Sequence, residues 1–309
     1  MQHITSLDNA LELFKALGSD VRIDIVKLLL KNGHMSMNEL AKELAITNGA
    51  ITNHIKKLEA CGLVSTSNDS AGHGNQKMCT LTTDKILIEL EPDLLDDNVY
   101  EVNLKVGHYS NYNLYPTCGL STNTALIGEV DDTRYFAHPD RYNADILWFT
   151  KGYIEYEIPN FIPSAHKITQ MTISLELSSE APGVNSNWPS DITFSLNGIE
   201  LGTWTSPGDF GDIQGIFTPD WWPLNWNQYG LLKLLVINKK GTFIDGLKIS
   251  DVNINQFIHD SANKYTLRME IKEDAKHVGG ITIFGESFGN YAQNIKVNVN
   301  YMPIDPTKQ

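Results

Sequence analysis

Residues 47–58 combine side chains that can read DNA with an apolar stripe that could hold them in place. Ile51, Ile55 and Leu58 recur at helical spacing and would share one side of a helix. Asn can bind adenine through two hydrogen bonds, Thr offers a hydroxyl and a methyl group, and Lys reaches guanine or phosphate. The predicted groove-facing residues are Asn48, Gly49, Ala50, Thr52, Asn53 and Lys56. The segment is therefore predicted to be a DNA-recognition helix, and an ordinary surface helix is the alternative.

A second set of side chains, in the C-terminal half, suits a small polar ligand. Aromatic rings gather there in a stretch rich in Gly, Pro, Asn and Asp, which places several of them on loops. Such rings stack on the apolar faces of sugars or on aromatic ligands, while amides and carboxylates bind hydroxyls. The predicted effector-binding residues are Trp188, Trp221, Trp222, Trp226, Tyr229, Tyr112 and Arg134. The predicted hydroxyl-binding neighbours are Asn185, Asn187, Asp209, Asp212, Asn225, Asn227 and Gln228.

Two further runs, residues 107–119 and 131–139, hold more polar aromatics than a plain linker would. They could line the same pocket or form an interdomain face, with Arg134 and Arg141 as cations for an acidic group. The alternative for the tryptophans is that they close the ends of a β-domain, and Trp148, among apolar neighbours, is predicted to lie in its core.

Glu155 and Glu157 are the residues most suited to catalysis, because they would share one face of a strand. A pair of carboxylates could act as the acid and the nucleophile of a glycoside hydrolase. Such a pair more often faces solvent, and no Ser-His-Asp order, phosphate-binding Gly loop or HExxH motif accompanies it. We therefore expect no catalytic residues and no enzyme, with a sandwich glycoside hydrolase as the alternative.

The recognition helix needs a helical scaffold, and the residues before it predict one. Apolar residues recur at helical spacing over residues 7–17 and again over residues 21–29, and glycines follow both segments. Ser36 and Glu39 have the spacing of a capping box at the start of a third helix. Thr47 is placed to cap the recognition helix itself.

The residues after the recognition helix predict a β-wing. Residues 63–66 and 78–81 have the character of short strands, and the polar stretch 67–77 between them suits a flexible wing. Three motifs resemble the ArsR-like winged-helix repressor family: residues 17–22 (LGSDVR), 38–41 (NELA) and 58–64 (LEACGLV). The resemblance covers roughly residues 7–83.

The resemblance implies a homodimer with two recognition helices in successive major grooves and two wings on the DNA backbone. It implies phosphate contacts for Lys57, His73 and Lys77. Metal-sensing members carry a Cys-x-Cys pair before the recognition helix, whereas this chain has no cysteine there, so we expect no bound metal. Residues 85–90 alternate like a strand, so the family's last dimerisation helix is expected to be absent and pairing to use other surfaces.

Composition limits the class of protein. A chain of 309 residues with 41% hydrophobic residues can bury large cores in two or more domains. No apolar run of 18 residues predicts a membrane span, and residues 1–6 lack the features of a secretory signal. Three separated cysteines form no disulfide framework, so a cytoplasmic protein is expected.

Charge is distributed unevenly along the chain. Residues 1–90 carry 9 basic and 10 acidic residues, and the remaining 15 basic and 27 acidic residues give residues 91–309 a net charge of −12. Residues 91–98 hold a proline and four acidic residues, which marks a linker. A near-neutral DNA reader beside an acidic body predicts weak non-specific affinity and dependence on dimerisation.

The sequence of the C-terminal half predicts an antiparallel β-structure. Hydrophobic and polar residues alternate over residues 173–177, 192–196, 265–271 and 295–301, and Asn197-Gly198 supplies a two-residue turn. No long helical pattern interrupts residues 150–301, which favours a sandwich. Residues 191–204 resemble the strands of jelly-roll, galactose-binding-like sandwiches found in carbohydrate-binding modules.

These observations predict a multidomain α+β chain, with a winged helix-turn-helix over residues 1–90, a linker over 91–98 and a jelly-roll-like antiparallel β-sandwich over 99–309. The predicted function is that of a one-component transcription regulator. Its partners would be a double-stranded DNA operator, a second copy of the chain and a small polar effector, such as a sugar or glycan fragment. No cofactor and no membrane are expected. The remaining alternative is an adaptor whose sandwich binds a protein partner.

Overall fold

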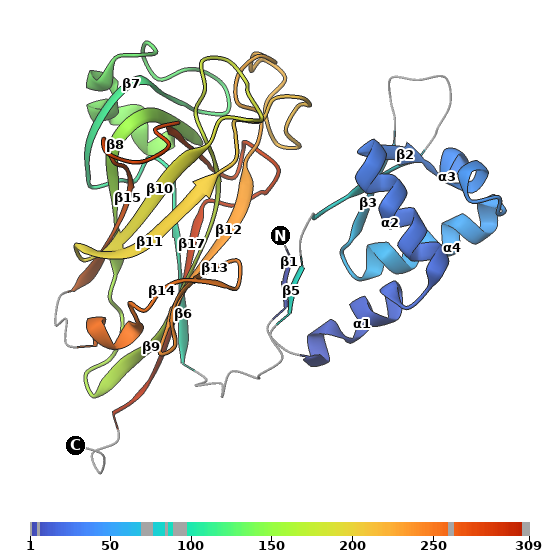
Figure 1. Cartoon of the computed structure of the whole chain (residues 1–309), viewed down its shortest axis with the longest axis horizontal. Helices are drawn as coiled ribbons and strands as arrows, with labels where there is room; N and C mark the ends of the chain where they lie inside the picture. The colour runs from blue at the N-terminus through green and yellow to red at the C-terminus, as the bar shows by residue number, and fades with distance from the viewer. Residues whose placement is uncertain are drawn as a thin grey trace. The chain divides into compact units, whose positions relative to one another are not determined.

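The computed structural model describes residues 2–4, 7–68, 77–83, 86–88, 98–258 and 263–304 (Figure 1). The chain divides into two compact units, Met1–Leu95 and Asp96–Gln309. Most of the predicted linker, residues 91–97, lies outside the described residues.

The described part of the N-terminal unit contains four helices and two small sheets. Its elements are β1 (Gln2–Ile4), α1 (Leu7–Leu17), α2 (Asp20–Asn32), β2 (His34–Ser36), α3 (Met37–Glu43), α4 (Asn48–Ala60), β3 (Val64–Asn68), β4 (Lys77–Leu81) and β5 (Ile86–Ile88). β4 pairs antiparallel with both β2 and β3, and β1 pairs in parallel with β5. This arrangement confirms the predicted winged helix. The strand predicted around residues 85–90 is β5, and the third wing strand, β2, was not predicted.

Both predicted helix caps are formed. The Glu39 backbone N–H donates to Ser36 Oγ at 3.2 Å, and the Ser36 backbone N–H donates to Glu39 Oε2 at 2.7 Å. This reciprocal pair is the capping box at the start of α3. Thr47 Oγ1 accepts from the Ala50 N–H at 3.2 Å, which sets the first turn of α4.

The core of the N-terminal unit forms around α4. Ile51, Ile55 and Leu58 are completely buried there, so the predicted apolar stripe is confirmed. In α1 the buried side is made by Ala10, Leu13 and Ala16. The larger apolar residues of α1 (Leu7, Leu11 and Phe14) are instead 49%, 51% and 46% exposed. Periodicity identified this helix correctly, but the small alanines occupy its inner face.

Among the described residues, no helix is long and apolar enough to cross a membrane.

The C-terminal unit is built almost entirely from strands (Figure 1). Its strands are β6 (Val99–Leu104), β7 (Asn111–Ser121), β8 (Ile146–Pro159), β9 (His166–Ser178), β10 (Ser190–Leu196), β11 (Ile199–Ser206), β12 (Leu231–Asn238), β13 (Gly241–Ile244), β14 (Leu247–Ser250), β15 (Lys264–Ile271), β16 (Ile281–Phe284) and β17 (Ile295–Pro303). Its short 3₁₀ helices are η1 (Thr133–Ala137), η2 (Pro139–Asn143) and η3 (Ile254–Phe257).

The strands pair antiparallel in two series that enclose one core. One series runs β11-β10-β15-β8-β7, and the other runs β6-β17-β9-β12-β13-β14. Strand β16 pairs with β8 on one side and β9 on the other, so it joins the two series. Buried side chains of both, including Ile154 of β8 and Ile173 of β9, belong to a single hydrophobic cluster. The predicted large antiparallel β-domain is therefore confirmed.

The predicted alternation and hairpin also appear in the structure. In β15 every second side chain, from Tyr265 to Ile271, is buried. β10 and β11 form the hairpin, and its turn residues Asn197 and Gly198 have φ values of +50° and +77°. Asn and Gly tolerate this left-handed region, which is why this dipeptide predicts the turn.

Replacing Ile55 by Ala should destabilise the N-terminal unit by about 2 to 5 kcal/mol, because the change leaves a cavity under α4. Urea unfolding followed by circular dichroism at 222 nm measures this, since the described α-helices all lie in this unit. All six tryptophans lie in the C-terminal unit, so their fluorescence should not change. The exposed control Lys42→Ala should alter stability by less than about 0.5 kcal/mol. A loss below 1 kcal/mol for Ile55→Ala would contradict this packing.

Candidate functional site

The first candidate site is the outer face of α4. Asn48, Gly49, Asn53 and Lys56 are exposed on it, while Ala50 and Thr52 are half-buried. The Thr52 hydroxyl donates to the Asn48 backbone carbonyl at 2.8 Å, so its methyl group and a hydroxyl lone pair remain for contact. Because the opposite side of α4 is fixed in the core, these side chains keep a defined direction.

The predicted phosphate contacts are only partly placed. Lys57, on the last turn of α4, and Lys77, at the start of β4, are both exposed. His73 lies outside the described residues.

Arg22 is a cation beside α4 that was not predicted, and it is buried. Its Nη2 donates to Lys15 O at 2.8 Å and its Nε donates to Ala16 O, so it holds the C-terminal end of α1. Its Nη1 lies 3.5 Å from Nδ1 of His54 on α4. Burial lowers the pKa of His54, and the charges of Arg22 and Lys57 lower it further. His54 therefore adds no positive charge to the DNA-facing side at neutral pH.

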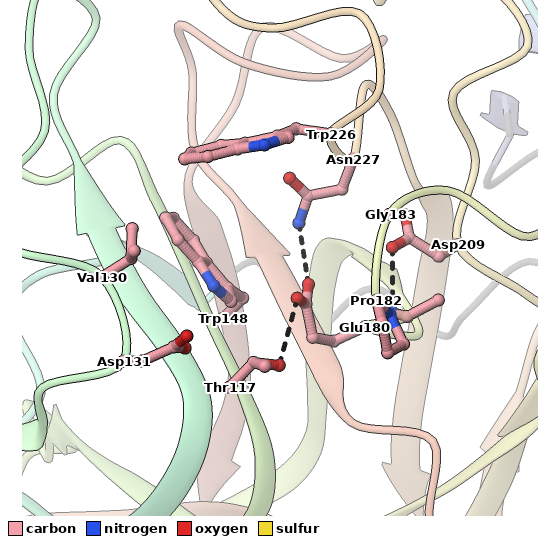
Figure 2. A pocket seen from close by; sticks show the side chains of 11 residues that line it. Thr117, Val130, Asp131, Trp148, Glu180, Pro182, Gly183, Asp209, Trp226 and Asn227 are labelled. Carbon is pink, nitrogen blue, oxygen red and sulfur yellow. Dashed lines mark hydrogen bonds between the residues drawn. The ribbon is translucent and has the colours of Figure 1, made fainter.

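The second candidate site is a pocket of about 170 Å³ in the C-terminal unit (Figure 2). Its lining residues are Thr117, Val130, Asp131, Trp148, Glu180, Ala181, Pro182, Gly183, Asp209, Trp226 and Asn227. They come from β7, the loop between β7 and η1, β8, the loop after β9 and the long loop between β11 and β12. Trp148, Asp209 and Asn227 are buried, whereas Asp131 and Pro182 are exposed at the rim.

Glu180 lies at the centre of the polar side of this pocket (Figure 2). Its Oε2 accepts from Asn227 Nδ2 at 3.1 Å and from Thr282 Oγ1 at 3.2 Å. Its Oε1 accepts from Thr117 Oγ1 at 3.5 Å. Burial raises the pKa of Glu180 well above its ordinary value, and the neighbouring carboxylate of Asp209 raises it further.

Asp209 is the second buried carboxylate of the pocket. It is 1% exposed, and its Oδ2 accepts from the Ala181 backbone N–H at 3.0 Å. Its Oδ1 has no hydrogen-bond partner among the described residues. Burial raises the pKa of Asp209 to about 7, although the bond from Ala181 acts in the opposite direction. The carboxyl is therefore close to half-ionised at neutral pH.

Three indole rings form the aromatic side of the pocket. Trp148 and Trp226 line it, with ring centroids 5.9 Å apart and planes inclined at 63°. Trp222 lies edge-on to both, at 5.8 Å from Trp148 and 4.9 Å from Trp226, and is 2% exposed. Trp222 therefore supports the two lining rings and cannot itself stack on a ligand.

Of the seven predicted effector-binding residues, the structure brings only Trp226 into the pocket. Trp222 is the buried support just described. Tyr229 stacks on Phe210, and its hydroxyl donates to Asp212 at 2.6 Å. Trp221 is exposed, with Nε1 donating to Asn123 O at 2.7 Å.

The other three predicted ligand contacts also lie outside the pocket lining. Trp188 is half-buried, with its Nε1 unpaired among the described residues. Tyr112 packs against Tyr109 and Phe136. Arg134 is 88% exposed and forms an ion pair with Asp132. Tyr112 thus has packing partners and Arg134 has a charge partner, and Trp188 is not among the lining residues.

The wider sequence predictions were closer to the observed lining. Asp209 and Asn227 belong to the predicted hydroxyl-binding set, and Thr117 and Asp131 fall in the two polar runs. Trp148 was predicted for the core, and it is buried while one side also lines the pocket. Glu180 was missed, because a single Glu after a strand carries no recognisable pattern.

The glutamates of the hydrolase alternative lie outside the pocket lining. Arg268 Nη2 is 2.7 Å from Glu155 Oε1, and Lys264 pairs with Glu157. Arg141, the other predicted cation, donates to the backbone carbonyls of Gly107 and Tyr109. Glu155, Glu157 and Arg141 thus each have a structural partner, and neither glutamate is among the residues that line the pocket described above.

Comparison with known proteins identifies the N-terminal segment. Residues 19–65 match the family model described as winged helix-turn-helix DNA-binding. An uncharacterised HTH-type transcriptional regulator from Methanocaldococcus jannaschii is 37% identical over 57 residues, which are 18% of this chain and 64% of that protein. The chain thus spans less than two thirds of this curated relative.

Solved structures resemble each unit separately. HlyU from Vibrio cholerae is 28% identical, with a TM-score of 0.22, covering 25% of this chain and 78% of that one. The CBM36-1 domain of a multidomain xylanase from the hindgut metagenome of Trinervitermes trinervoides is 9% identical. That comparison has a TM-score of 0.27 and covers 66% of this chain and 97% of that one.

The raised carboxyl pKa values predict that the C-terminal unit loses stability as pH rises. Asp209 is ionised above about pH 4 in the unfolded chain but only above about 7 in the fold. Its contribution is therefore complete below pH 4 and lost by pH 7, by at most about 4 kcal/mol. Urea unfolding followed by tryptophan fluorescence between pH 5 and 8 measures the slope.

Asp209→Asn should flatten this pH dependence, because an amide does not titrate. The matched control is Asp140→Asn, whose carboxylate is exposed, and it should keep the wild-type slope. A wild-type unit that becomes more stable between pH 5 and 7 would contradict the raised pKa of Asp209.

Proposed function

We propose that this protein is a DNA-binding transcription regulator in which α4 reads an operator and the C-terminal pocket binds a small polar effector. The observation that carries the proposal is the exposed polar face of α4, fixed by its buried stripe within a segment that matches a DNA-binding winged-helix model. A segment of this type places its second helix in the major groove. Asn48, Asn53 and Lys56 would supply base contacts, and Lys57 and Lys77 would bind phosphates.

We infer that the regulator acts as a homodimer that pairs through α1. Leu7, Leu11 and Phe14 are each about half exposed and recur at helical spacing, so they form one exposed apolar stripe. Contiguous exposed apolar surface of this kind is typical of protein interfaces. Pairing would also double the number of phosphate contacts, which a near-neutral DNA reader needs.

The pocket supports the effector half of the proposal. It combines two indole walls with carboxylate and amide groups, which is the composition of a site for a polar ligand such as a sugar or glycan fragment. Its volume of about 170 Å³ lies below the range of about 300 to 1,000 Å³ for larger ligands, so it favours a small molecule or one end of a longer one. Effector binding would change DNA affinity if the two states of the dimer bind it differently.

An adaptor role is the second candidate, and exposed apolar side chains favour it. Ile213, Ile216 and Leu224 lie on the loop between β11 and β12 and are 59%, 61% and 68% exposed. A protein partner could cover such side chains. An adaptor would not need specific DNA binding, so the DNA experiment separates the two candidates.

Replacing Asn53 and Lys56 together by Ala should weaken binding to DNA from the chain's own promoter region by about 100-fold or more. The change removes one base-reading amide and one cation, each contributing about 1 to 3 kcal/mol. Fluorescence anisotropy with labelled duplex at physiological salt measures the affinity. The unfolding curve should stay within about 0.5 kcal/mol of wild type, because both side chains are exposed. Unchanged DNA affinity would contradict the role of α4.

Replacing Leu11 by Glu should shift the protein from dimer to monomer, because it puts a charge into the proposed α1 interface. Analytical ultracentrifugation across protein concentrations measures the change. Leu30→Glu is the control, because Leu30 is 60% exposed on α2 rather than α1, and it should leave the dimer intact. A wild-type protein that stays monomeric at high concentration would contradict pairing through α1.

A further inference from the structure

The lining of the pocket is acidic and carries no balancing cation. Asp131, Glu180 and Asp209 contribute three carboxyl groups, and none of the lining residues is Lys, Arg or His. The two cationic side chains nearest in sequence are engaged elsewhere, since Arg134 pairs with Asp132 and Lys151 pairs with Glu273. A neutral ligand would leave the buried carboxyls largely protonated, whereas a cation would stabilise an ionised carboxylate among them.

The aromatic walls favour a particular kind of cation. The rings of Trp148 and Trp226 are inclined at 63°, so their faces form two sides of a corner. An indole face attracts an ammonium group, and the attraction strengthens when both are removed from water. A metal ion would instead require several oxygen ligands and would gain little from indole faces.

One carboxylate oxygen is available to such a ligand. Asp209 Oδ1 is buried and has no partner among the described residues, although Asp209 lines the pocket. A buried acceptor without a donor is costly, and a ligand cation would reduce that cost, either by donating an N–H or by its positive charge alone. Glu180 differs, because three side-chain donors already hold its two oxygens in place.

We propose that the pocket binds the ammonium end of a small organic cation, with Trp148 and Trp226 against its carbon atoms and Asp209 as its ionic partner. Glu180 accepts from Asn227 Nδ2 and so holds that amide beside the same space. The inference rests on the proposed function, because it names the class of effector for that pocket.

Binding of a cation should release a proton from the pocket. The pKa of Asp209 is raised to about 7, so an ammonium group that stabilises the ionised form must displace a proton near neutral pH. The other titratable groups in and beside the pocket are Glu180, Asp131, the Cys118 thiol and the ion pair of Asp132 with Arg134. Burial raises the pKa of Cys118 to about 12, so this thiol stays protonated. Affinity should rise about tenfold between pH 6 and pH 8 and then level off.

The test is calorimetric titration of the full chain with two matched pairs of probes. Choline is compared with its uncharged analogue 3,3-dimethylbutan-1-ol, and glucosamine is compared with glucose. At least one cation of the two pairs should bind about tenfold or more tightly than its neutral partner. Choline has a permanent charge, so any change in its affinity between pH 6 and 8 must come from the titration of groups on the protein.

Two variants locate the site. Trp226→Ala should weaken binding of the cation by about tenfold to thirtyfold, because it removes one aromatic wall. The matched control Trp221→Ala removes an exposed indole that does not line the pocket and should leave affinity unchanged. Asp209→Asn should abolish the rise in affinity between pH 6 and 8, and its tryptophan-monitored unfolding checks that it remains folded.

The outcomes separate this inference from the proposed function. Binding with equal affinity for cation and neutral partner in both pairs would overturn the inference while leaving a polar-effector pocket in place. Tight binding of calcium chloride alone that displaces choline would overturn it in favour of a metal site. Absence of binding by all four compounds would overturn it too, and DNA binding by the same preparation would then still support the regulator.

Discussion

The apolar stripe of α4 is the contact on which the DNA-reading unit depends. Ile51, Ile55 and Leu58 are completely buried, so rotation of the helix would expose large apolar surface. The same contact therefore stabilises the unit and decides which side chains face outward. Arg22 reinforces it, because it links the C-terminal end of α1 to His54 of α4. The Thr47 cap fixes the first turn of the same helix.

The pocket depends on a different interaction, the burial of two acidic side chains, Glu180 and Asp209. Strand β7 carries Thr117, β8 carries Trp148 and the loop after β9 carries Glu180, and the pairing of β8 and β9 with β16 brings these three residues to one pocket. Burial of Glu180 and Asp209 costs free energy at neutral pH, as their raised pKa values indicate. Buried groups with perturbed pKa values in a cavity are typical of functional sites. A cationic effector would stabilise an ionised carboxylate in the pocket, so its binding would offset the cost of burial.

Sequence periodicity predicted the helices, the wing strands and the Asn197-Gly198 hairpin, because these depend on local spacing and on single turn residues. It did not predict which side of α1 is buried, since Ala10 and Ala16 carry little hydrophobic signal of their own. The pocket was predicted least well. Thr117, Glu180 and Asp209 are far apart in the chain and meet only through long-range strand pairing, whereas most of the conspicuous aromatics pack locally.

The central claim is that the outward face of α4 reads a specific DNA sequence. Its most direct test is a competition measurement with the unmodified full chain at physiological salt, in which random duplex displaces labelled DNA from the chain's own promoter region. A specific reader should prefer the promoter DNA by about 10³-fold or more. Equal affinity for the two DNAs, at every salt concentration at which binding occurs, would contradict the account.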